Sequence, residues 1–467
     1  MNSSQALNDP SREALAEVIE GEALVPGDTR YDEVRAVWNG RFDRRPALIA
    51  CCISREDVAS AVRFARAHEL SVSVKGGGHD YAGNTVADGG LLIDLGAMCT
   101  VHVDRVARRA TVQAGATWGD VDAATQAYGL ATPAGTISNV GVAGFTLGGG
   151  AGWLTPKYGL AVDNLMAAEV VTADGDIVRA SEEENADLLW ALRGGGGNFG
   201  IVTSLEYALH PVGPDVYAGQ VMYPVERAGE LLRLFRDQMS DVSGDLAAFF
   251  FFLRIPPLEF FPEEHHGAIA VDFVLTWLGP IEEGEAALAP FRELGDPIFE
   301  MVGPQPYVAL QQSFDAGMSA KGNRWYSRFH YLDELSDAAI DAITGGLDPF
   351  PGEFTTVYLA KEGGAVSRVP SEATAFPHRG AEYSIHIFPG WIDSGSDGAV
   401  MNWAKSFSHT IASHAGDGVY VNMLAEDEVE RIGRAYGENF ERLRSLKAKW
   451  DPENVFRMNH NIAPEGD

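Results

Sequence analysis

Apolar and polar residues along the first half of the chain follow short periods that predict a mixture of strands and helices. The apolar run 47–53 predicts a strand, and Ser54 with Asp57 forms a capping-box pattern that predicts a helix through about Leu70. Val72 and Val74 alternate with small polar residues, which predicts a short strand at 72–75. The same criteria predict strands at 91–95, 168–172, 176–180 and 200–209, a hairpin across 101–113, and helices at 118–128 and 184–193.

The pattern changes after Pro211 and Pro214, where we expect a domain boundary. Beyond this boundary, long strand-like runs alternate with helical segments. This alternation predicts an antiparallel sheet with helices on one face, so the expected fold class is α+β. The long strand-like runs lie at 247–255, 268–277 and 383–388, and they alternate with helices near 227–239 and 282–295.

Near the C-terminus, apolar residues recur at helical spacing and predict one continuous helix with a buried face. Asp451-Pro452 ends this predicted helix. The residues on the buried face are Ile432, Ala435, Tyr436, Asn439, Phe440, Leu443 and Leu446.

The composition excludes several classes of protein. The 467 residues carry a formal net charge of −31, and a nucleic-acid-binding surface requires a positive field, so we expect no nucleic-acid partner. The start of the chain has neither a basic region nor an apolar core of a signal peptide, and no apolar run reaches ~18 residues. We therefore expect a cytoplasmic protein without a membrane partner.

Cysteine and histidine patterns favour neither a disulfide framework nor a metal site. The three cysteines, Cys51, Cys52 and Cys99, form no CxxC pattern. His265-His266 follows Glu263-Glu264, but the spacing does not recur, so we expect a solvated loop there and no metal.

Two glycine-rich segments indicate a ligand site. Gly76 to Gly78 follow the strand at 72–75 and allow the backbone to lie against a large flat ligand, with His79 at the tip. A plain glycine-rich turn with an incidental histidine is the alternative. The longer run 129–164 presents successive backbone N–H groups, which suit a pyrophosphate.

A GxGxxG match at Gly195, Gly197 and Gly200 has the wrong context for a Rossmann fold. That fingerprint must follow a strand and open a helix, whereas here a helix precedes the match and a strand follows. We reject a Rossmann fold for this reason.

Four motifs in order along the chain resemble the berberine bridge enzyme-like flavoproteins of the vanillyl-alcohol oxidase group. They are Lys75-Gly-Gly-Gly-His79-Asp-Tyr-Ala-Gly, the loop Gly148–Gly152, Lys157-Tyr-Gly-Leu-Ala-Val-Asp-Asn164, and the tail from Tyr436 through Asp451-Pro452 to Phe456. The resemblance implies a two-part FAD-binding domain, 1–212 completed by 419–467. The central segment, 213–418, would be the substrate domain, built on an antiparallel sheet covered by helices.

The resemblance also implies the cofactor and its contacts. His79 would be bonded through its ring to the 8α-methyl of FAD, which withdraws electron density and raises the flavin potential. The implied FAD contacts are Lys75, Gly76, Gly77, Gly78, His79, Asp80, Tyr81, Gly135, Thr136, Asn139, Val140, Gly144, Gly148, Gly149, Gly150, Gly152, Tyr158, Gly159, Asp163, Asn164, Gly200, Ile201, Val202, Asn422, Asn459 and Asn461.

The chain departs from its relatives at one informative position. Many relatives carry a second flavin link from a cysteine after a Gly-Thr pair, but Gly135-Thr136 is followed here by Ile137, which cannot form a thioether. We expect a single covalent link. Val140 stands where the family has valine for oxygen access or leucine for its obstruction, which implies an oxidase.

The family places the catalytic base on the substrate side of the flavin. The candidates are Tyr420, Tyr383 and His386, and alternation is expected to place Tyr420 and Asn422 on one face of a strand. A tyrosine with an ordinary pKa of ~10 needs an activating neighbour to act as a base at neutral pH.

The resulting expectation is a covalent-FAD oxidoreductase. It would oxidise an alcohol, sugar or hydroxylated secondary metabolite by hydride transfer to flavin N5, with molecular oxygen as acceptor and H₂O₂ as product. Two alternatives remain. One is an FAD-dependent dehydrogenase with another acceptor. The other is a flavin-binding protein without turnover, favoured by Gly144-Phe145, where relatives often have Gly-His.

Overall fold

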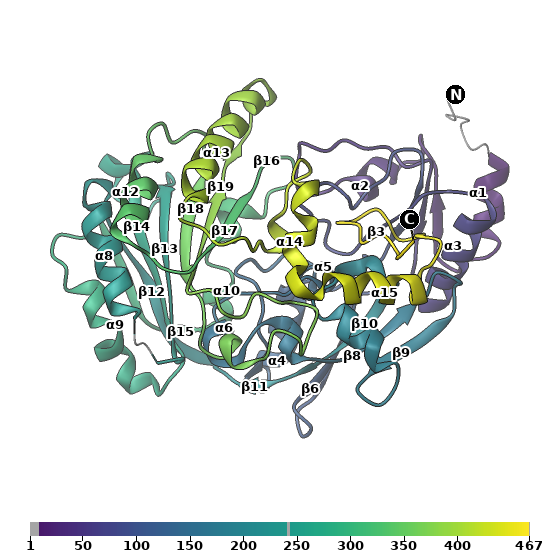
Figure 1. Cartoon of the computed structure of the whole chain (residues 1–467), viewed down its shortest axis with the longest axis horizontal. Coiled ribbons are helices and arrows are strands. Elements are labelled where there is room, and N and C mark those ends of the chain that lie inside the picture. Colours follow the sequence, from purple (N-terminus) through teal and green to yellow (C-terminus); the bar gives the residue numbers. More distant parts are fainter. Residues whose placement is uncertain (1–8, 241–242, 467) are drawn as a thin grey trace.

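Two smaller sheets from the first part of the chain lie beside a third, larger sheet in the computed structural model, which describes residues 9–240 and 243–466 (Figure 1). The first sheet has the order β1-β2-β4-β3, in which β2 and β3 both run parallel to β4. Its strands are β1 (Glu22–Leu24), β2 (Leu48–Cys51), β4 (Leu91–Asp94) and β3 (Val72–Lys75).

Helix α3 (Arg55–Ala67) connects β2 to β3, and its N-terminus confirms half of the capping-box prediction. Ser54 Oγ accepts the N–H of Asp57 at 3.1 Å. The Asp57 carboxylate accepts the N–H groups of Ile53 at 3.0 Å and Gly21 at 3.1 Å, so it ties the start of α3 to the segment that enters β1.

The second sheet is antiparallel throughout and has the order β5-β6-β10-β8-β9. Its strands are β5 (Val101–Asp104), β6 (Arg109–Gln113), β10 (Ile201–Ala208), β8 (Leu165–Val171) and β9 (Ile177–Ser181). Helices α4 (Trp118–Gln126) and α7 (Ala186–Leu192) also lie close to their predicted positions.

The third sheet has seven antiparallel strands in the order β15-β12-β14-β13-β18-β19-β17. Its strands are β15 (Phe299–Pro306), β12 (Asp215–Pro224), β14 (Ile269–Trp277), β13 (Leu246–Arg254), β18 (Thr356–Lys361), β19 (Tyr383–Phe388) and β17 (Arg328–Leu332). One face is covered by α8 (Ala228–Gln238), α9 (Gly284–Arg292), α12 (Asp337–Gly345) and α13 (Asp397–Ala412) (Figure 1). This arrangement confirms the predicted α+β class.

Four consecutive phenylalanines on β13 show how the third sheet separates its two faces. Phe250 and Phe252 pack in the core beneath the helices, whereas Phe249 and Phe251 lie on the opposite face. Successive side chains of a strand point to opposite faces, so one strand contributes both to the core and to the surface that meets the first half of the chain.

The C-terminal segment returns to the first half of the chain. The prediction of one continuous helix there is wrong, because the helix is interrupted at Gly437, whose φ is +47°. The break separates α14 (Ile432–Tyr436) from a 3₁₀ turn and α15 (Phe440–Trp450). Buried Lys447 on α15 pairs with Asp451 at 2.6 Å and donates to the carbonyl of Asn198 at 2.7 Å, which fastens this helix to the loop before β10.

Across the described residues, the helices are either too short or too polar to cross a lipid bilayer. No cluster of His, Cys, Asp and Glu in that same part of the chain has the geometry of a metal site.

Candidate active site

A cavity of about 390 Å³ lies between the glycine-rich loops and the face of the third sheet that the helices leave uncovered. Loops after β3 and before β10, together with α5 (Val142–Leu147), form one wall. Side chains from β13, β18 and β19 form the opposite wall, and residues 420–423 and 456–460 of the C-terminal segment close the side.

The glycine loop after β3 allows two stretches of backbone to meet at the cavity. A Cβ on Gly77 would lie 2.3 Å from the backbone nitrogen of Gly141, and one on Gly141 would lie 2.4 Å from the nitrogen of Gly77. Gly78 has φ +72°, a conformation that side chains disfavour. Glycine is therefore required here so that the segment carrying His79 can approach the segment carrying Val140.

His79 lies at the edge of this wall with a neutral ring. Burial lowers its pKa to about 4, and the positive charge of Lys321 acts in the same direction. At neutral pH the imidazole therefore has a nitrogen lone pair available for bonding.

Tyr420 contacts the glycine wall from the C-terminal segment. Its hydroxyl oxygen accepts the N–H of Gly150 at 2.7 Å and the side-chain N–H of Asn422 at 2.9 Å. Burial raises the pKa of Tyr420 to about 12, while the two donated hydrogen bonds act in the opposite direction because they favour the phenolate. Tyr420 is thus a buried phenol whose anionic form has two donors already in place.

The position of the Asn422 side chain requires a glycine at residue 148. Its side-chain N–H also donates to the carbonyl of Phe145 at 2.9 Å, and its amide oxygen would lie 2.0 Å from a Cβ on Gly148. A side chain at position 148 would therefore displace Asn422 and remove one donor from Tyr420.

The prediction of a strand at Tyr420 and Asn422 is wrong. Residues Val421–Met423 form a 3₁₀ turn, with extended backbone at the flanking residues Tyr420 and Leu424. A 3₁₀ turn has three residues per turn, yet Asn422 still reaches Tyr420 because its amide folds back onto the hydroxyl.

The sheet wall of the cavity is mainly aromatic. Tyr358 on β18 and His386 on β19 stack with ring centroids 4.1 Å apart, and Phe251 stacks on Tyr358 at 4.8 Å. Burial lowers the pKa of His386 to about 3, which leaves this ring neutral.

Tyr383 does not belong to this wall, which corrects its prediction as a catalytic candidate. It lies three residues before His386 on the same strand, so alternation places it on the other face, in the core beneath the helices. Burial raises its pKa to about 12, and its ring lies under the ammonium group of Lys361.

Glu362 is a cavity residue that the sequence analysis missed. It follows β18, accepts a hydrogen bond from Ser384 Oγ at 2.7 Å, and burial raises its pKa. The alternation of Thr356, Tyr358 and Ala360 toward the cavity leads to Glu362, and this signal could have identified it.

Most of the implied FAD contacts line the cavity. Those that do are Gly76, Gly77, Gly78, His79, Asp80, Tyr81, Gly135, Thr136, Val140, Gly144, Gly148, Gly200, Ile201, Val202, Asn422 and Asn459. Ile137 also lines it, whereas the side chains of Cys51 and Cys52 are buried elsewhere and Cys99 is exposed.

Other implied contacts lie outside the lining and hold the loops in place. Lys75 pairs with Asp94 at 3.0 Å. Asp163 forms a bidentate ion pair with Arg379, with N···O distances of 2.7 and 2.8 Å. The other implied contacts that are not part of the lining are Asn139, Gly149, Gly150, Gly152, Tyr158, Gly159, Asn164 and Asn461.

The residues of this wall fit a large flat cofactor that carries phosphates. A Cβ built on Gly144 or on Gly197 meets no atom within 4 Å, so both glycines open onto space. The buried amide oxygen of Asn459 lines the same cavity and has no partner among the described protein groups. Open backbone and an unpartnered polar atom are features expected of a wall that binds a nucleotide.

Comparisons with known proteins agree with this geometry. Residues 46–181 match the family model described as FAD binding domain, and residues 419–463 match the model described as berberine and berberine like. The chain is 34% identical to (R)-6-hydroxynicotine oxidase of Paenarthrobacter nicotinovorans over 96% of this chain and 98% of that protein. A FAD-linked oxidoreductase of Dictyostelium discoideum is 32% identical, over 96% of both chains.

Solved structures share the whole fold. The crystal structure of 6-hydroxy-D-nicotine oxidase from Arthrobacter nicotinovorans superimposes with a TM-score of 0.86 at 30% identity, covering 96% of this chain and 98% of that one. Glucooligosaccharide oxidase from Acremonium strictum, whose FAD carries 6-S-cysteinyl and 8α-N1-histidyl links, gives a TM-score of 0.85 at 27% identity, covering 97% of this chain and all of that one.

Proposed function

We propose that this chain, which belongs to the berberine bridge enzyme-like FAD-linked oxidoreductases, is an oxidase that takes a hydride from a CH–OH carbon of a small molecule bound in the cavity. The division proposed from the sequence remains part of this proposal: residues 1–212 and 419–467 bind FAD, and residues 213–418 bind the substrate. The observation that carries the proposal is Tyr420, a cavity phenol with two N–H donors on its oxygen.

Tyr420 would act as the base. With two donors already on its oxygen, the phenolate has one remaining position that can accept a proton. The substrate hydroxyl would lose its proton to this oxygen while the adjacent carbon loses a hydride, so the alcohol becomes a carbonyl compound. FAD, when bound, supplies the hydride acceptor at its N5 position.

His79 would hold the cofactor by a single covalent bond. Its neutral imidazole and its position beside the glycine loop support this assignment. The histidyl link of the Acremonium strictum relative provides a precedent, and Ile137 stands where a cysteinyl link would need a thiol. A bonded imidazole raises the flavin potential and favours hydride uptake from an alcohol.

Molecular oxygen is the proposed acceptor, with H₂O₂ as product. Val140 lines the cavity next to the backbone contact between Gly77 and Gly141, and its small side chain would leave a path for oxygen. A dehydrogenase that passes electrons to a quinone or dye is the alternative for the same site.

Glu362 favours a second candidate substrate class, basic amines. When ionised, the buried carboxyl group of Glu362 would stabilise a cation by charge, and Tyr358 and Tyr420 lie close enough to Glu362 for its charge to act on their pKa values. A relative over nearly the whole chain is named for oxidising 6-hydroxynicotine, whose skeleton contains a basic amine.

An anaerobic substrate screen tests these candidates. Purified protein is mixed without oxygen with sugars, aliphatic and aromatic alcohols, and cyclic amines, and the loss of flavin absorbance is recorded before air is admitted. Bleaching by alcohols and one H₂O₂ per reduced flavin support the proposed oxidase. Slow reoxidation in air with fast dye reduction supports the dehydrogenase, and a flavin that no compound reduces contradicts turnover.

The Glu362→Gln variant separates the two substrate classes. The variant removes the charge but retains the hydrogen-bond acceptor for Ser384, so packing is preserved. If amines are the substrates, the Glu362→Gln protein should bind amines more weakly than the wild type does and should bind alcohols equally well. Equal binding of amines by the two proteins contradicts the second candidate.

A further inference from the structure

Four nearly parallel aromatic rings lie together beside the glycine loop. His79 stacks on Trp38 with centroids 4.9 Å apart and planes at 23°, and Trp38 stacks on Trp325 at 4.9 Å and 11°. Trp325 in turn stacks on Phe388 at 5.0 Å and 13°. The two tryptophans are at most 2% exposed, so the ring that His79 contacts has little freedom to move.

The orientation of the His79 ring depends on this stack. Within residues 9–240 and 243–466, no hydrogen bond to a ring nitrogen of His79 is formed. The usual means of orienting a reactive histidine is a hydrogen bond to the nitrogen that does not react. Here the indole face of Trp38 is the contact that limits the rotation of the imidazole.

Trp38 itself is held by three hydrogen bonds. Its backbone N–H donates to the carbonyl of Gly78 at 3.1 Å, and its carbonyl accepts the N–H of Gly322 at 3.2 Å. Its indole N–H donates to the carbonyl of Met318 at 2.6 Å. Trp38 is thus fixed both to the loop that carries His79 and to the segment that precedes Trp325.

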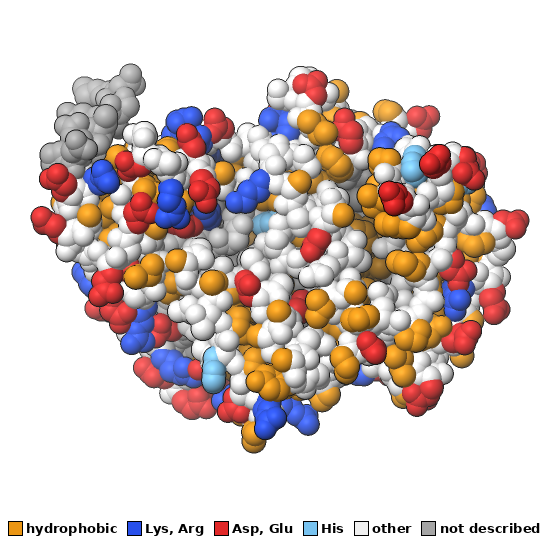
Figure 2. Space-filling model, turned by 180° about the vertical axis from the view of Figure 1, so that it is seen from behind, with side chains coloured by type: hydrophobic (Ala, Val, Ile, Leu, Met, Phe, Trp, Pro, Cys, Tyr) orange, Lys and Arg blue, Asp and Glu red, His pale blue; other side chains and the backbone are white. Residues whose placement is uncertain are grey.

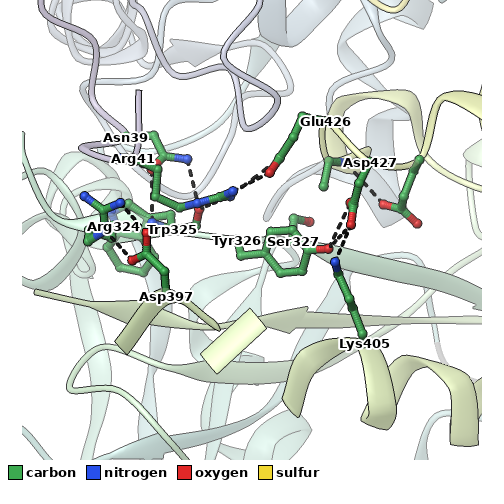
Figure 3. Close-up of polar contacts among 12 residues, drawn as sticks. Asn39, Arg41, Arg324, Trp325, Tyr326, Ser327, Asp397, Lys405, Glu426 and Asp427 are labelled. Carbon is green, nitrogen blue, oxygen red and sulfur yellow. Dashed lines mark hydrogen bonds and ion pairs between the residues drawn. The ribbon is translucent and has the colours of Figure 1, made fainter. Parts of the chain in front are cut away.

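The residues after Trp38 anchor it more firmly (Figure 3). Asn39 and Trp325 exchange two hydrogen bonds, at 2.9 and 3.1 Å, and Arg41 pairs with Glu426 of the C-terminal segment. Arg324 pairs through two hydrogen bonds with Asp397 at the start of α13. Three distant parts of the chain therefore meet around the tryptophan that contacts His79.

We propose that Trp38 is a positioning residue for the bond between His79 and FAD, an inference that rests on the covalent link proposed above. The new bond joins an imidazole nitrogen to the 8α carbon of the flavin and replaces one C–H bond there and the imidazole N–H. The two hydrogens and two electrons leave with dioxygen as H₂O₂. Trp38 holds the imidazole so that a nitrogen lone pair points at that carbon.

The test compares covalent with total flavin in the purified protein. Trp38→Met removes the flat ring but fills space, Trp38→Leu is a second such variant, and Trp38→Phe keeps an aromatic face. Each protein is incubated with FAD in air, samples are precipitated with acid over time, and flavin in the pellet is measured against total flavin. Because orientation of reacting groups is lost, we expect covalent flavin to form about 10-fold or more slowly in the Met and Leu variants. Trp38→Phe should form covalent flavin at close to the wild-type rate, because it keeps an aromatic face.

Trp403→Met is the matched control. Trp403 is a half-buried tryptophan of α13 that packs on Phe350 and Phe407, and its indole N–H donates to the carbonyl of Gly346 at 3.2 Å. We expect this variant to be less stable but to form covalent flavin at the wild-type rate. Wild-type rates in the Trp38→Met or Trp38→Leu protein overturn the role of Trp38. Equal slowing in Trp403→Met also overturns it, because general destabilisation then explains the effect. A wild-type protein whose flavin washes out overturns the covalent link itself.

Discussion

The hydroxyl oxygen of Tyr420 accepts the backbone N–H of Gly150 at 2.7 Å, although the two residues are 270 positions apart in the sequence. The neighbouring glycines make this contact possible. A Cβ on Gly149 would lie 2.9 Å from the Tyr420 ring, and the φ of Gly149 is +140°. The glycine run 148–150 therefore packs against the phenol that we propose as the base. Of these three glycines, only Gly148 lines the cavity.

Tyr420→Phe should reduce the rate of flavin reduction by ~10²–10⁴-fold, because it removes the proton acceptor but keeps the ring and its packing. The free energy of unfolding should fall by about 1–3 kcal/mol, because the buried N–H of Gly150 loses its acceptor, and the fold should be retained. The measurement is anaerobic stopped-flow reduction of the flavin by a substrate found in the screen.

Tyr383→Phe is the control for this prediction, since Tyr383 lies on the face of the third sheet that points away from the cavity. It should reduce its flavin at the wild-type rate. A Tyr420→Phe protein as fast as the wild type would move the base to another cavity group, His386 first.

Asn422→Ala should shift the pH dependence of flavin reduction to higher pH. The pKa of Tyr420 is raised by burial to about 12, and the N–H of Asn422 acts to lower it. The base reacts as phenolate, so the rate should rise with pH below this pKa, and removal of the donor should lower the rate at each such pH. The decrease is about 10-fold for each unit of pKa change. A pH profile identical to that of the wild type would show that Asn422 does not tune the base.

Val140→Leu should slow reoxidation of the reduced flavin by oxygen while leaving its reduction by substrate unchanged. The added methylene would narrow the path beside Gly77 and Gly141. Val302→Leu, on β15 and outside the cavity lining, is the size-matched control. Unchanged reoxidation in Val140→Leu would remove the argument that Val140 admits oxygen.

Asp272 should make the protein less stable as the pH rises. Neither buried carboxylate oxygen of this β14 residue has a hydrogen-bond partner among the described residues, and burial raises its pKa well above the ordinary value. In the unfolded chain it titrates near pH ~4. Its contribution to stability is therefore greatest below that pH and is lost as the pH rises toward the folded pKa, by up to about 1.4 kcal/mol per pH unit.

Asp272→Asn should flatten this dependence between pH 4 and 7, as measured by urea unfolding. The substitution conserves the number of non-hydrogen atoms in the side chain, so cavity effects are avoided. Parallel stability–pH curves for the variant and the wild type would show that Asp272 keeps the same protonation state in the folded and unfolded protein.

The parts of the fold predicted best from the sequence are those with strong local signals. The helix after Ser54, the hairpin across 101–113 and the strands at 247–255 and 268–277 lie where they were expected, within a few residues. By contrast, β12, β15, β17 and β18 were not assigned, because their residues pair across long stretches of chain and have few turn signals. The break at Gly437 was also missed, since the apolar spacing continues through it.

The candidate site divides in the same way. Glycine-rich loops can be recognised from a short stretch of sequence, so Gly76 to Gly78 and His79 could be predicted. The sheet wall depends on which residues of a strand face the cavity. Alternation alone relates Tyr383 to His386 but does not say which of the two faces inward, and Glu362 lies one residue beyond the end of its strand. Only the packing of helices on one face decides the question.

The most direct test of the account is where the flavin is found after denaturation. The purified protein is precipitated with acid, the pellet is digested, and the peptides are analysed by mass spectrometry. We predict a yellow pellet and one flavin-bearing peptide whose modified residue is His79, with unmodified Cys51, Cys52 and Cys99. A colourless pellet with all the flavin in the supernatant, or a flavin attached to any other residue, would contradict the account.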